Sequence, residues 1–373
     1  MRYFIIVGEA SGDLHASALM KELKICDAQA EFCFLGGDLM LNQGGKMVRH
    51  YSQMAFMGIV NVLLNLNKVA ENARICKRAI RDFVPDVVLL VDYPGFNLRI
   101  AKFVKKNLQI PVYYYIAPKL WAWKSYRIKS IKKYVDRAFT IFPFETQYFA
   151  QFGYNVDYVG NPTVDSIDNF LESGELKSIK SDKSIVALLS GSRRQEISKC
   201  LPVMSKMAGY FTDFKFVVAA APSIEKDFYT KILPDNVEIV YNQTYSLVKQ
   251  SFAAVVNSGT ATLETALLGT PQVVVYHVIG GRFATLLKKI LIHIPYISLV
   301  NLIAEKEAVK ELVTHHFTEE NLRNELCKVL YDNNLRDKIE QDYQKIKLSL
   351  GHRGTAKQAA EAIYKNAKQV ISE

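Results

Sequence analysis

Two turns rich in small residues are the segments of this sequence best suited to chemistry. Each follows an apolar run and opens a helical pattern: Gly191-Ser192-Arg193, with Arg194 beside it, and Asn257-Ser258-Gly259-Thr260. Such a turn directs backbone N–H groups and the positive end of a helix dipole toward one point, where an anion can bind. Glu264, one helical turn beyond the second turn, is placed to accept hydrogen bonds from sugar hydroxyls. Either turn alone could be a solvated loop or a helix cap. Together they predict the diphosphate site of a nucleotide-sugar enzyme.

A candidate general base follows a strand-like run in the first half. Asp92 ends the apolar run that begins at Asp86 and precedes Tyr93-Pro94-Gly95. The carboxyl ends of parallel strands border the crevice in which open α/β sheets bind ligands, so Asp92 is the predicted base. A cap for the helix that begins near Asn97 is the alternative.

The first apolar run is followed by Gly8-Glu9-Ala10-Ser11-Gly12-Asp13. This is not G-x-G-x-x-G, which disfavours a dinucleotide site. The two glycines would allow a ligand to approach the backbone, and Glu9 or Asp13 could bind a sugar hydroxyl. We predict a catalytic role for Glu9 and a substrate contact at Ser11. A plain helix start capped by Ser11 or Asp13 is the alternative.

Aromatic and apolar segments could bind acyl chains. Five aromatic residues fall between Tyr113 and Trp123. Trp121 and Trp123 are predicted ligand contacts, whereas Tyr113 to Tyr115 better fit a buried strand. Residues 56–69, which include the predicted substrate contact Met57, and residues 282–292 resemble interfacial helices. Packing into the core of the protein is the alternative for both.

Composition limits the classes of function. At 373 residues the chain is long enough for two cores, and 49% hydrophobic with 23% charged residues is ordinary for a globular protein. A net charge of +10 favours acidic partners, either phosphates or an anionic membrane. The five cysteines form no CxxC pair and fit a reducing cytoplasm. The histidines form no HExxH pattern and no Asp-x-Asp occurs, so we expect neither a metal nor a cofactor.

Strand-like runs alternate with helical patterns through the whole chain. The runs are continuous and rich in β-branched and aromatic residues, as in parallel strands covered on both faces. The sequence therefore predicts an α/β protein with two doubly wound, Rossmann-like parallel-sheet domains facing an interdomain cleft, the GT-B arrangement. We place the first domain at 1–163, the second at 164–350, and a C-terminal helix at 351–373. The predicted linker consists of Gly160-Asn161-Pro162 and the polar stretch from Asp165 to Ser184.

Eight segments, in order, resemble the lipid-A-disaccharide synthase family. They are GEASGD at Gly8–Asp13, MGIVNVL at Met57–Leu63, PDVVLLVDYPGFN at Pro85–Asn97, YYIAPKLWAW, FPFE at Phe142–Glu145, GSRRQEI, NSGTATLETALLGTP, and PYISLVNLIA at Pro295–Ala304. The resemblance implies an inverting, metal-independent glycosyltransferase. Such an enzyme joins UDP-2,3-diacylglucosamine to 2,3-diacylglucosamine 1-phosphate (lipid X) through a β-1,6 linkage and releases UDP.

The resemblance also implies site residues and a location. The catalytic aspartate of the family falls on Asp92, its donor-site arginine on Arg193, its ribose-binding glutamate on Glu264, and an asparagine near the donor on Asn301. The first domain would bind the acceptor and the membrane, the second would bind the UDP-sugar, and the C-terminal helix would cross back to the first. A cytoplasmic enzyme peripheral to the anionic inner membrane is expected, with no nucleic-acid partner. A homodimer remains one alternative for the oligomeric state.

Two positions depart from the family, and two other readings stay open. Many members carry Glu at the position of Asn61 and His at that of Asn161, which weakens any role of those positions in acceptor binding. Another UDP-GlcNAc-using GT-B enzyme, either a GlcNAc transferase or a non-hydrolysing 2-epimerase, is the nearest alternative. An RNA- or membrane-binding module without catalysis would need clustered basic residues, but only Lys124 to Lys133 provide such a cluster.

Overall fold

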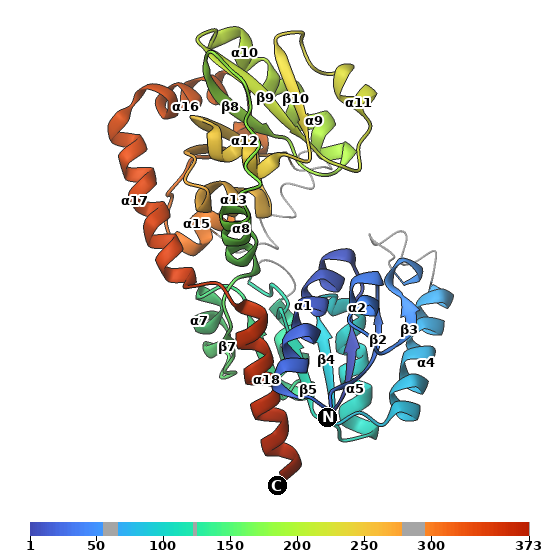
Figure 1. Cartoon of the computed structure of the whole chain (residues 1–373). Coiled ribbons are helices and arrows are strands. Elements are labelled where there is room, and N and C mark those ends of the chain that lie inside the picture. The colour runs from blue at the N-terminus through green and yellow to red at the C-terminus, as the bar shows by residue number, and fades with distance from the viewer. Residues whose placement is uncertain (55–65, 122–124, 278–294, 373) are drawn as a thin grey trace. The chain divides into compact units, whose positions relative to one another are not determined.

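The computed structural model describes residues 1–54, 66–121, 125–277 and 295–372 and consists of two compact units (Figure 1). Unit 1 comprises Met1–Pro162 and Arg353–Glu373, and unit 2 comprises Thr163–His352. The sequence places the domain boundaries after residues 163 and 350, and the structure places them after residues 162 and 352. Among the described residues, no helix is long and apolar enough to span a bilayer.

Unit 1 is built on a parallel sheet in the order β3-β2-β1-β4-β5-β6-β7. Its strands are β1 (Arg2–Ile6), β2 (Glu31–Gly36), β3 (Lys46–His50), β4 (Val87–Val91), β5 (Val112–Tyr115), β6 (Arg137–Thr140) and β7 (Asp157–Tyr158). Its α-helices are α1 (Ala10–Cys26), α2 (Asp38–Asn42), α4 (Leu66–Phe83), α5 (Pro94–Asn107), α6 (Ile128–Tyr134), α7 (Phe144–Ala150) and α18 (Thr355–Ser372), and 3₁₀ turns occupy Tyr51–Gln53 and Ser125–Arg127.

The sheet of unit 1 is covered on both faces, which explains its continuous apolar strands. Successive strand residues point to opposite faces. Phe4 and Ile6 of β1 therefore pack with residues of α4, α5 and α6, whereas Tyr3 and Ile5 pack with residues of α1. The prediction of parallel strands buried on both faces is confirmed here.

The C-terminal helix α18 belongs to unit 1 although most of unit 1 lies early in the chain. Four of its apolar residues, spaced to lie on one helical face, are fully buried: Ala359, Ala360, Ile363 and Ala367. They pack into the core on the face of the sheet that α1 covers, and Figure 1 shows α18 beside α1. Helix α18 therefore completes the core of unit 1.

Unit 2 is built on a parallel sheet in the order β10-β9-β8-β11-β12-β13. Its strands are β8 (Ser184–Leu189), β9 (Phe214–Ala220), β10 (Val237–Tyr241), β11 (Ala253–Asn257), β12 (Gln272–Tyr276) and β13 (Glu311–Val313). Its α-helices are α8 (Pro162–Ser173, which begins at the last residue of unit 1), α9 (Arg194–Ser205), α10 (Met207–Tyr210), α11 (Lys226–Thr230), α12 (Thr244–Gln250), α13 (Thr260–Leu267), α15 (Leu299–Ala304), α16 (Glu319–Tyr331) and α17 (Asn333–Leu350), and a 3₁₀ turn occupies Thr314–His316.

Part of the predicted linker is helical. Residues 162–173 form α8, and only the following residues up to β8 lack regular structure. Val164 and Ile167, one turn apart on α8, are each 2% exposed, so the helix is fixed by packing. The stretch is polar overall, so the sequence pattern did not reveal that Val164 and Ile167 are buried and hold the helix in place.

Candidate functional site

The two predicted anion-binding turns lie on one crevice in unit 2. They follow β8 and β11, which are neighbours in the sheet, so both turns stand at the same carboxyl edge. The crevice encloses about 440 Å³. Its lining includes seven of the predicted substrate-binding residues: Gly191, Ser192, Arg193, Asn257, Ser258, Gly259 and Thr260.

The second turn presents unpaired backbone donors to this crevice. In the described part of the chain, the N–H groups of Thr260 and Ala261 at the start of α13 donate to no acceptor, and no side chain caps the helix. Gly259 has open space where a Cβ would project, so no side chain blocks the approach. Amides at a helix start, together with the helix dipole, are suited to hold a phosphate.

The first turn carries the positive charge. Arg193 is the N-cap residue of α9, and its side chain is 71% exposed. Its Nη1 donates to Oε1 of Glu196 at 2.8 Å. Arg194 is directed elsewhere, because its Nη2 pairs with Glu225 and its guanidinium lies over the Phe228 ring. Of the two arginines, only Arg193 lines the crevice.

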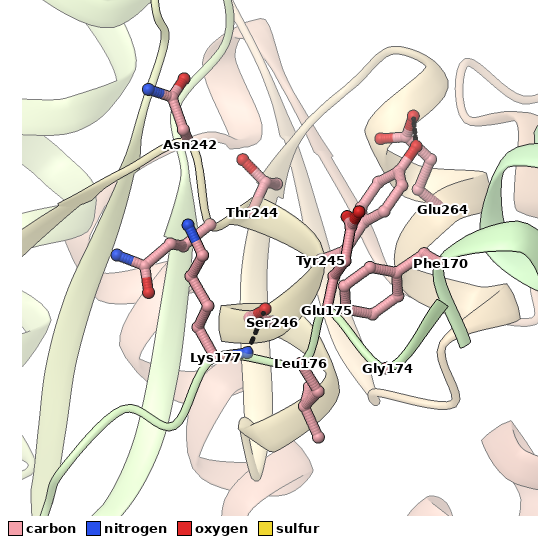
Figure 2. Close-up of a pocket in the computed structure, with 11 residues that line it drawn as sticks. Phe170, Gly174, Glu175, Leu176, Lys177, Asn242, Thr244, Tyr245, Ser246 and Glu264 are labelled. Carbon is pink, nitrogen blue, oxygen red and sulfur yellow. Dashed lines mark hydrogen bonds between the residues drawn. The ribbon is translucent and has the colours of Figure 1, made fainter. Parts of the chain in front are cut away.

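A larger cavity of about 890 Å³ lies next to the crevice, and Thr244 lines both. Figure 2 shows Glu264 at this cavity, hydrogen-bonded to the hydroxyl of Tyr245, which donates to Oε1 at 3.1 Å. The Tyr245 ring packs edge-to-face against Phe170, with ring centroids 5.4 Å apart. Burial raises the pKa of Glu264, and the hydrogen bond from Tyr245 opposes that shift. The cavity thus combines a carboxylate with aromatic walls beside the anion-binding turns.

In unit 1, Asp92 stands on a strained turn at the carboxyl end of β4. Asp92 and Tyr93 both have positive φ, 44° and 48°, in the left-handed region that is costly for such residues. The backbone is held there because the Asp92 carbonyl accepts hydrogen bonds from Nδ2 of Asn97, at 2.7 Å, and from the hydroxyl of Tyr114. Burial raises the pKa of Asp92, against the opposing charge of Lys119 and the N–H of Tyr93. A raised pKa suits a carboxylate that accepts a proton during reaction.

The predicted residues after β1 occupy the neighbouring strand end. The Tyr93 ring lies so close to Gly8 that a Cβ there would come within 2.3 Å of it, and this explains the glycine. Glu9 is the N-cap residue of α1 and Ser11 is exposed on the first turn. Since β1 pairs with β4, Glu9 and Asp92 follow adjacent strands at the same edge.

Asp13 is a structural residue. It is 3% exposed, and its carboxylate accepts the N–H groups of Gly37 at 2.8 Å, Leu39 at 3.1 Å and Met40 at 3.2 Å. It therefore caps the start of α2, and its burial keeps it away from a sugar hydroxyl. Of the two acids considered in this turn, Glu9 remains the candidate.

Trp121 is held by a buried acid in an aromatic cluster. Its Nε1 donates to Oε1 of Glu145 at 2.9 Å, and its ring packs edge-to-face on Phe142 and Phe144. The ammonium group of Lys119 lies 5.4 Å from the centroid of the Phe142 ring. This charge also acts on Asp92 and on His15, whose pKa burial and Lys119 together lower to about 4. Tyr113 to Tyr115 are buried in β5, as predicted.

The comparisons with known proteins identify the family. A family model for lipid-A-disaccharide synthetase matches residues 3–367. The chain is 35% identical to a lipid-A-disaccharide synthase of Syntrophus aciditrophicus (strain SB), with 95% of each chain covered. It is 33% identical to that of Myxococcus xanthus (strain DK1622), with 97% of this chain and 96% of the relative covered. The chain belongs to the lipid-A-disaccharide synthase family.

Solved structures show the GT-B fold. A UDP-GlcNAc 2-epimerase from Neisseria meningitidis, bound to UDP-GlcNAc, matches with a TM-score of 0.66 and 15% identity over 98% of this chain and all of that one. The glycotransferase of kitacinnamycin matches with a TM-score of 0.66 and 13% identity over 98% of each chain. At such identities the likeness concerns the fold alone. Membership of the lipid-A-disaccharide synthase family makes the chain a glycosyltransferase of lipid A biosynthesis, with a UDP-sugar donor and a lipid acceptor.

Asn301 does not reach the crevice as a ligand. It is fully buried, Oδ1 accepts the N–H groups of Ala308 and Val309, and Nδ2 donates to the Val309 carbonyl and to Glu311. All four hydrogen-bonding positions of the amide are therefore used within the protein. The structure supports a role in holding the loop after α15, in place of the predicted donor contact.

The structure describes only one of the remaining predicted positions, Asn161. Met57, Asn61, Trp123 and residues 282–292 lie outside the described residues, as does most of 56–69. Asn161 is 1% exposed and donates to the Ile141 carbonyl at 2.8 Å, so in this member of the family it braces the turn after β6.

Three charged residues near these sites escaped the sequence analysis as functional candidates: Lys119, Glu145 and Glu196. Each lies inside a segment that resembles the family, namely YYIAPKLWAW, FPFE and GSRRQEI. That position was the available signal. Lys119 and Glu145 contact residues that are distant in sequence, and Glu196 contacts residues that the shape of its own turn brings close. The spacing of residues in the sequence could not identify these contacts.

The environment of Glu145 predicts that the stability of the protein depends on pH. Burial raises its pKa to about 7, although the N–H groups of Trp121, Phe142 and Ile141 and the charge of Lys119 favour the ionised form. A carboxyl group whose folded-state pKa is raised stabilises the protein fully below its unfolded pKa, and this contribution disappears as pH rises through 7. We expect the stability of the native protein relative to Glu145→Gln to fall between pH 4.5 and 7 by up to about 1.4 kcal/mol per pH unit. Urea unfolding of both proteins at pH 5 and pH 8 measures this, and a difference independent of pH would contradict it.

Proposed function

We propose that the chain transfers 2,3-diacylglucosamine from its UDP derivative to lipid X and releases UDP. Family membership supports this reaction. The single structural observation that carries it is the crevice of unit 2, where amides of two helix starts and the Arg193 guanidinium surround a space suited to a diphosphate. The charge on UDP increases as it leaves, and fixed dipoles in a partly enclosed site stabilise that charge.

The donor would occupy both cavities of unit 2. Its diphosphate would lie in the crevice between the turns at Arg193 and Gly259, and its nucleoside would extend past Thr244 into the larger cavity, where Glu264 would accept ribose hydroxyls. The 890 Å³ of that cavity is ample for a nucleoside.

Asp92 would act as the general base for the acceptor. Its 6-hydroxyl attacks the anomeric carbon from the face opposite UDP, the new C–O bond forms as the bond to the diphosphate breaks, and the proton passes to the Asp92 carboxylate. The configuration at the anomeric carbon is thereby inverted. Glu9, after the adjacent strand, and Trp121 are the other acceptor-side candidates.

A lipid acceptor places the reaction at a membrane. We propose a cytoplasmic enzyme peripheral to the anionic inner membrane, supported by the net charge of +10 and by the lipid substrates of the family. Flotation with vesicles containing anionic lipid tests this, because binding should weaken when neutral lipid replaces the anionic lipid.

Mass spectrometry of the products tests the reaction. Incubation with UDP-2,3-diacylglucosamine and lipid X should yield the disaccharide 1-phosphate and UDP, at the same rate with and without a chelator. UDP-GlcNAc alone should remain unchanged. Consumption of UDP-GlcNAc alone would favour a 2-epimerase, and the absence of any disaccharide would refute the proposal.

The role of Glu264 gives a further prediction. A hydrogen bond to a charged group contributes about 1.5–3 kcal/mol, so the native protein should bind UDP roughly tenfold or more tightly than 2′-deoxy-UDP. Glu264→Ala should bind the two equally, because the discriminating carboxylate is absent. Tyr245→Phe, which keeps the carboxylate, is the matched control and should retain the preference. Calorimetric titration of both nucleotides measures the ratio, and a preference retained in Glu264→Ala would exclude this ribose contact.

A further inference from the structure

The crevice predicted for the diphosphate already contains an anion, the carboxylate of Glu196. This residue lies in the first turn of α9 and lines the crevice. Its Oε2 accepts the backbone N–H of Ser192 at 3.2 Å, and its Oε1 accepts Nη1 of Arg193 at 2.8 Å. These are two of the donors that a phosphate in this crevice would use.

The shape of the turn keeps the carboxylate against those donors. Gly191 has φ +108°, a conformation that favours glycine, and a Cβ there would lie 2.6 Å from Oε2 of Glu196 and 2.8 Å from Nδ2 of Asn257. The glycine thus makes room for the acid. The Glu196 side chain is 24% exposed, compared with 71% for Arg193, so the carboxylate folds onto the turn while the guanidinium remains accessible.

We propose that Glu196 is an internal competitor of the diphosphate. Before a ligand binds, Glu196 holds the Ser192 amide and one nitrogen of Arg193, and it releases both when a nucleoside diphosphate binds. A carboxylate that stayed beside the diphosphate would repel it. As UDP departs, the carboxylate takes back its donors, so Glu196 keeps the turn ordered and limits the affinity for the product. This inference rests on the proposed function of the crevice as the diphosphate site.

A purely structural role makes the opposite prediction. An acid in the first turn of a helix stabilises the helix by pairing with its dipole and its free N–H groups. If that were the whole role of Glu196, removing its charge would loosen the turn and weaken UDP binding. Competition predicts tighter binding, so the sign of the change distinguishes the two.

The test is calorimetric titration of UDP into the full-length native protein and into Glu196→Gln, which keeps the shape and removes the charge. We expect the Kd for UDP to fall by about two- to fivefold, a change typical of one partly exposed charge interaction. Uridine, which carries no phosphate, should bind both proteins equally. The inhibition constant of UDP in the transferase assay should fall by the same factor. Glu225→Gln is the matched control, since Glu225 pairs with Arg194 outside the crevice, and it should leave the Kd unchanged.

Unchanged or weaker UDP binding by Glu196→Gln would overturn the proposal, as would an equal gain for uridine. If Glu196→Gln does not fold, Glu196→Ala replaces it and must shift the Kd in the same direction. Failure of the underlying function has a different signature: the native protein would then not bind UDP, or Arg193→Ala would bind it as tightly as the native protein. If the native protein binds UDP, Arg193→Ala weakens that binding and Glu196→Gln does not strengthen it, then only the proposed role of Glu196 is refuted. The function of the crevice as the diphosphate site would stand.

Discussion

Asp92→Asn should form disaccharide about 10²- to 10⁴-fold more slowly than the native protein while binding UDP with the same affinity. The amide retains the size of the carboxylate but cannot accept the proton of the attacking hydroxyl. The turn should survive, because Asn97 and Tyr114 hold it through the backbone carbonyl of residue 92 and not through its side chain. Initial rates with both substrates and calorimetric titration of UDP measure the two quantities.

Asp86→Asn is the matched control for this variant. Asp86 precedes the same strand at the opposite edge of the sheet, where its Oδ2 accepts the N–H of Arg2 at 2.7 Å. Its loss should alter stability slightly and leave the rate near the native value. Since burial raises the pKa of Asp92, the acidic limb of kcat/KM should lie above the ordinary aspartate pKa and vanish in the variant. Full turnover by Asp92→Asn would show that another group accepts the proton.

Arg193→Ala should lose both UDP affinity and rate, with kcat/KM about 10²- to 10³-fold lower. The guanidinium is the cation that lines the crevice among the described residues, and the amides at the start of α13 cannot replace its full charge. Arg194→Ala removes a neighbouring charge that pairs with Glu225 outside the crevice. It should cost little, because an exposed ion pair is worth about 0–1 kcal/mol. Equal losses in the two variants would indicate general attraction by positive charge in place of a positioned contact.

Strand composition explains how much of the fold was predictable. Interior strands such as β4 are apolar throughout because helices cover both faces of the sheet, and the sequence shows this pattern directly. The strands β3, at one edge of the first sheet, and β13, at one edge of the second, lack a long apolar run. Lys46–His50 contains only two apolar residues, Met47 and Val48, and is only partly buried, so it lacks the apolar run that marks an interior strand.

The candidate site was predictable where chemistry depends on backbone position. The turns at Arg193 and Gly259 follow adjacent strands, so strand order alone brings them to one crevice. Side-chain direction was not predictable in the same way. The family resemblance placed Asn301 near the donor, yet its four hydrogen bonds are satisfied inside the fold. The sequence analysis gave Glu196 no functional role, although its carboxylate lines the crevice and accepts the N–H of Ser192.

A crystal structure of the protein with UDP tests the central claim most directly. The account predicts that the diphosphate accepts hydrogen bonds from the amides at the start of α13 and from Arg193, with the Glu196 carboxylate displaced and the ribose against Glu264. A diphosphate bound elsewhere, with the turns at Ser192 and Gly259 empty, would contradict it.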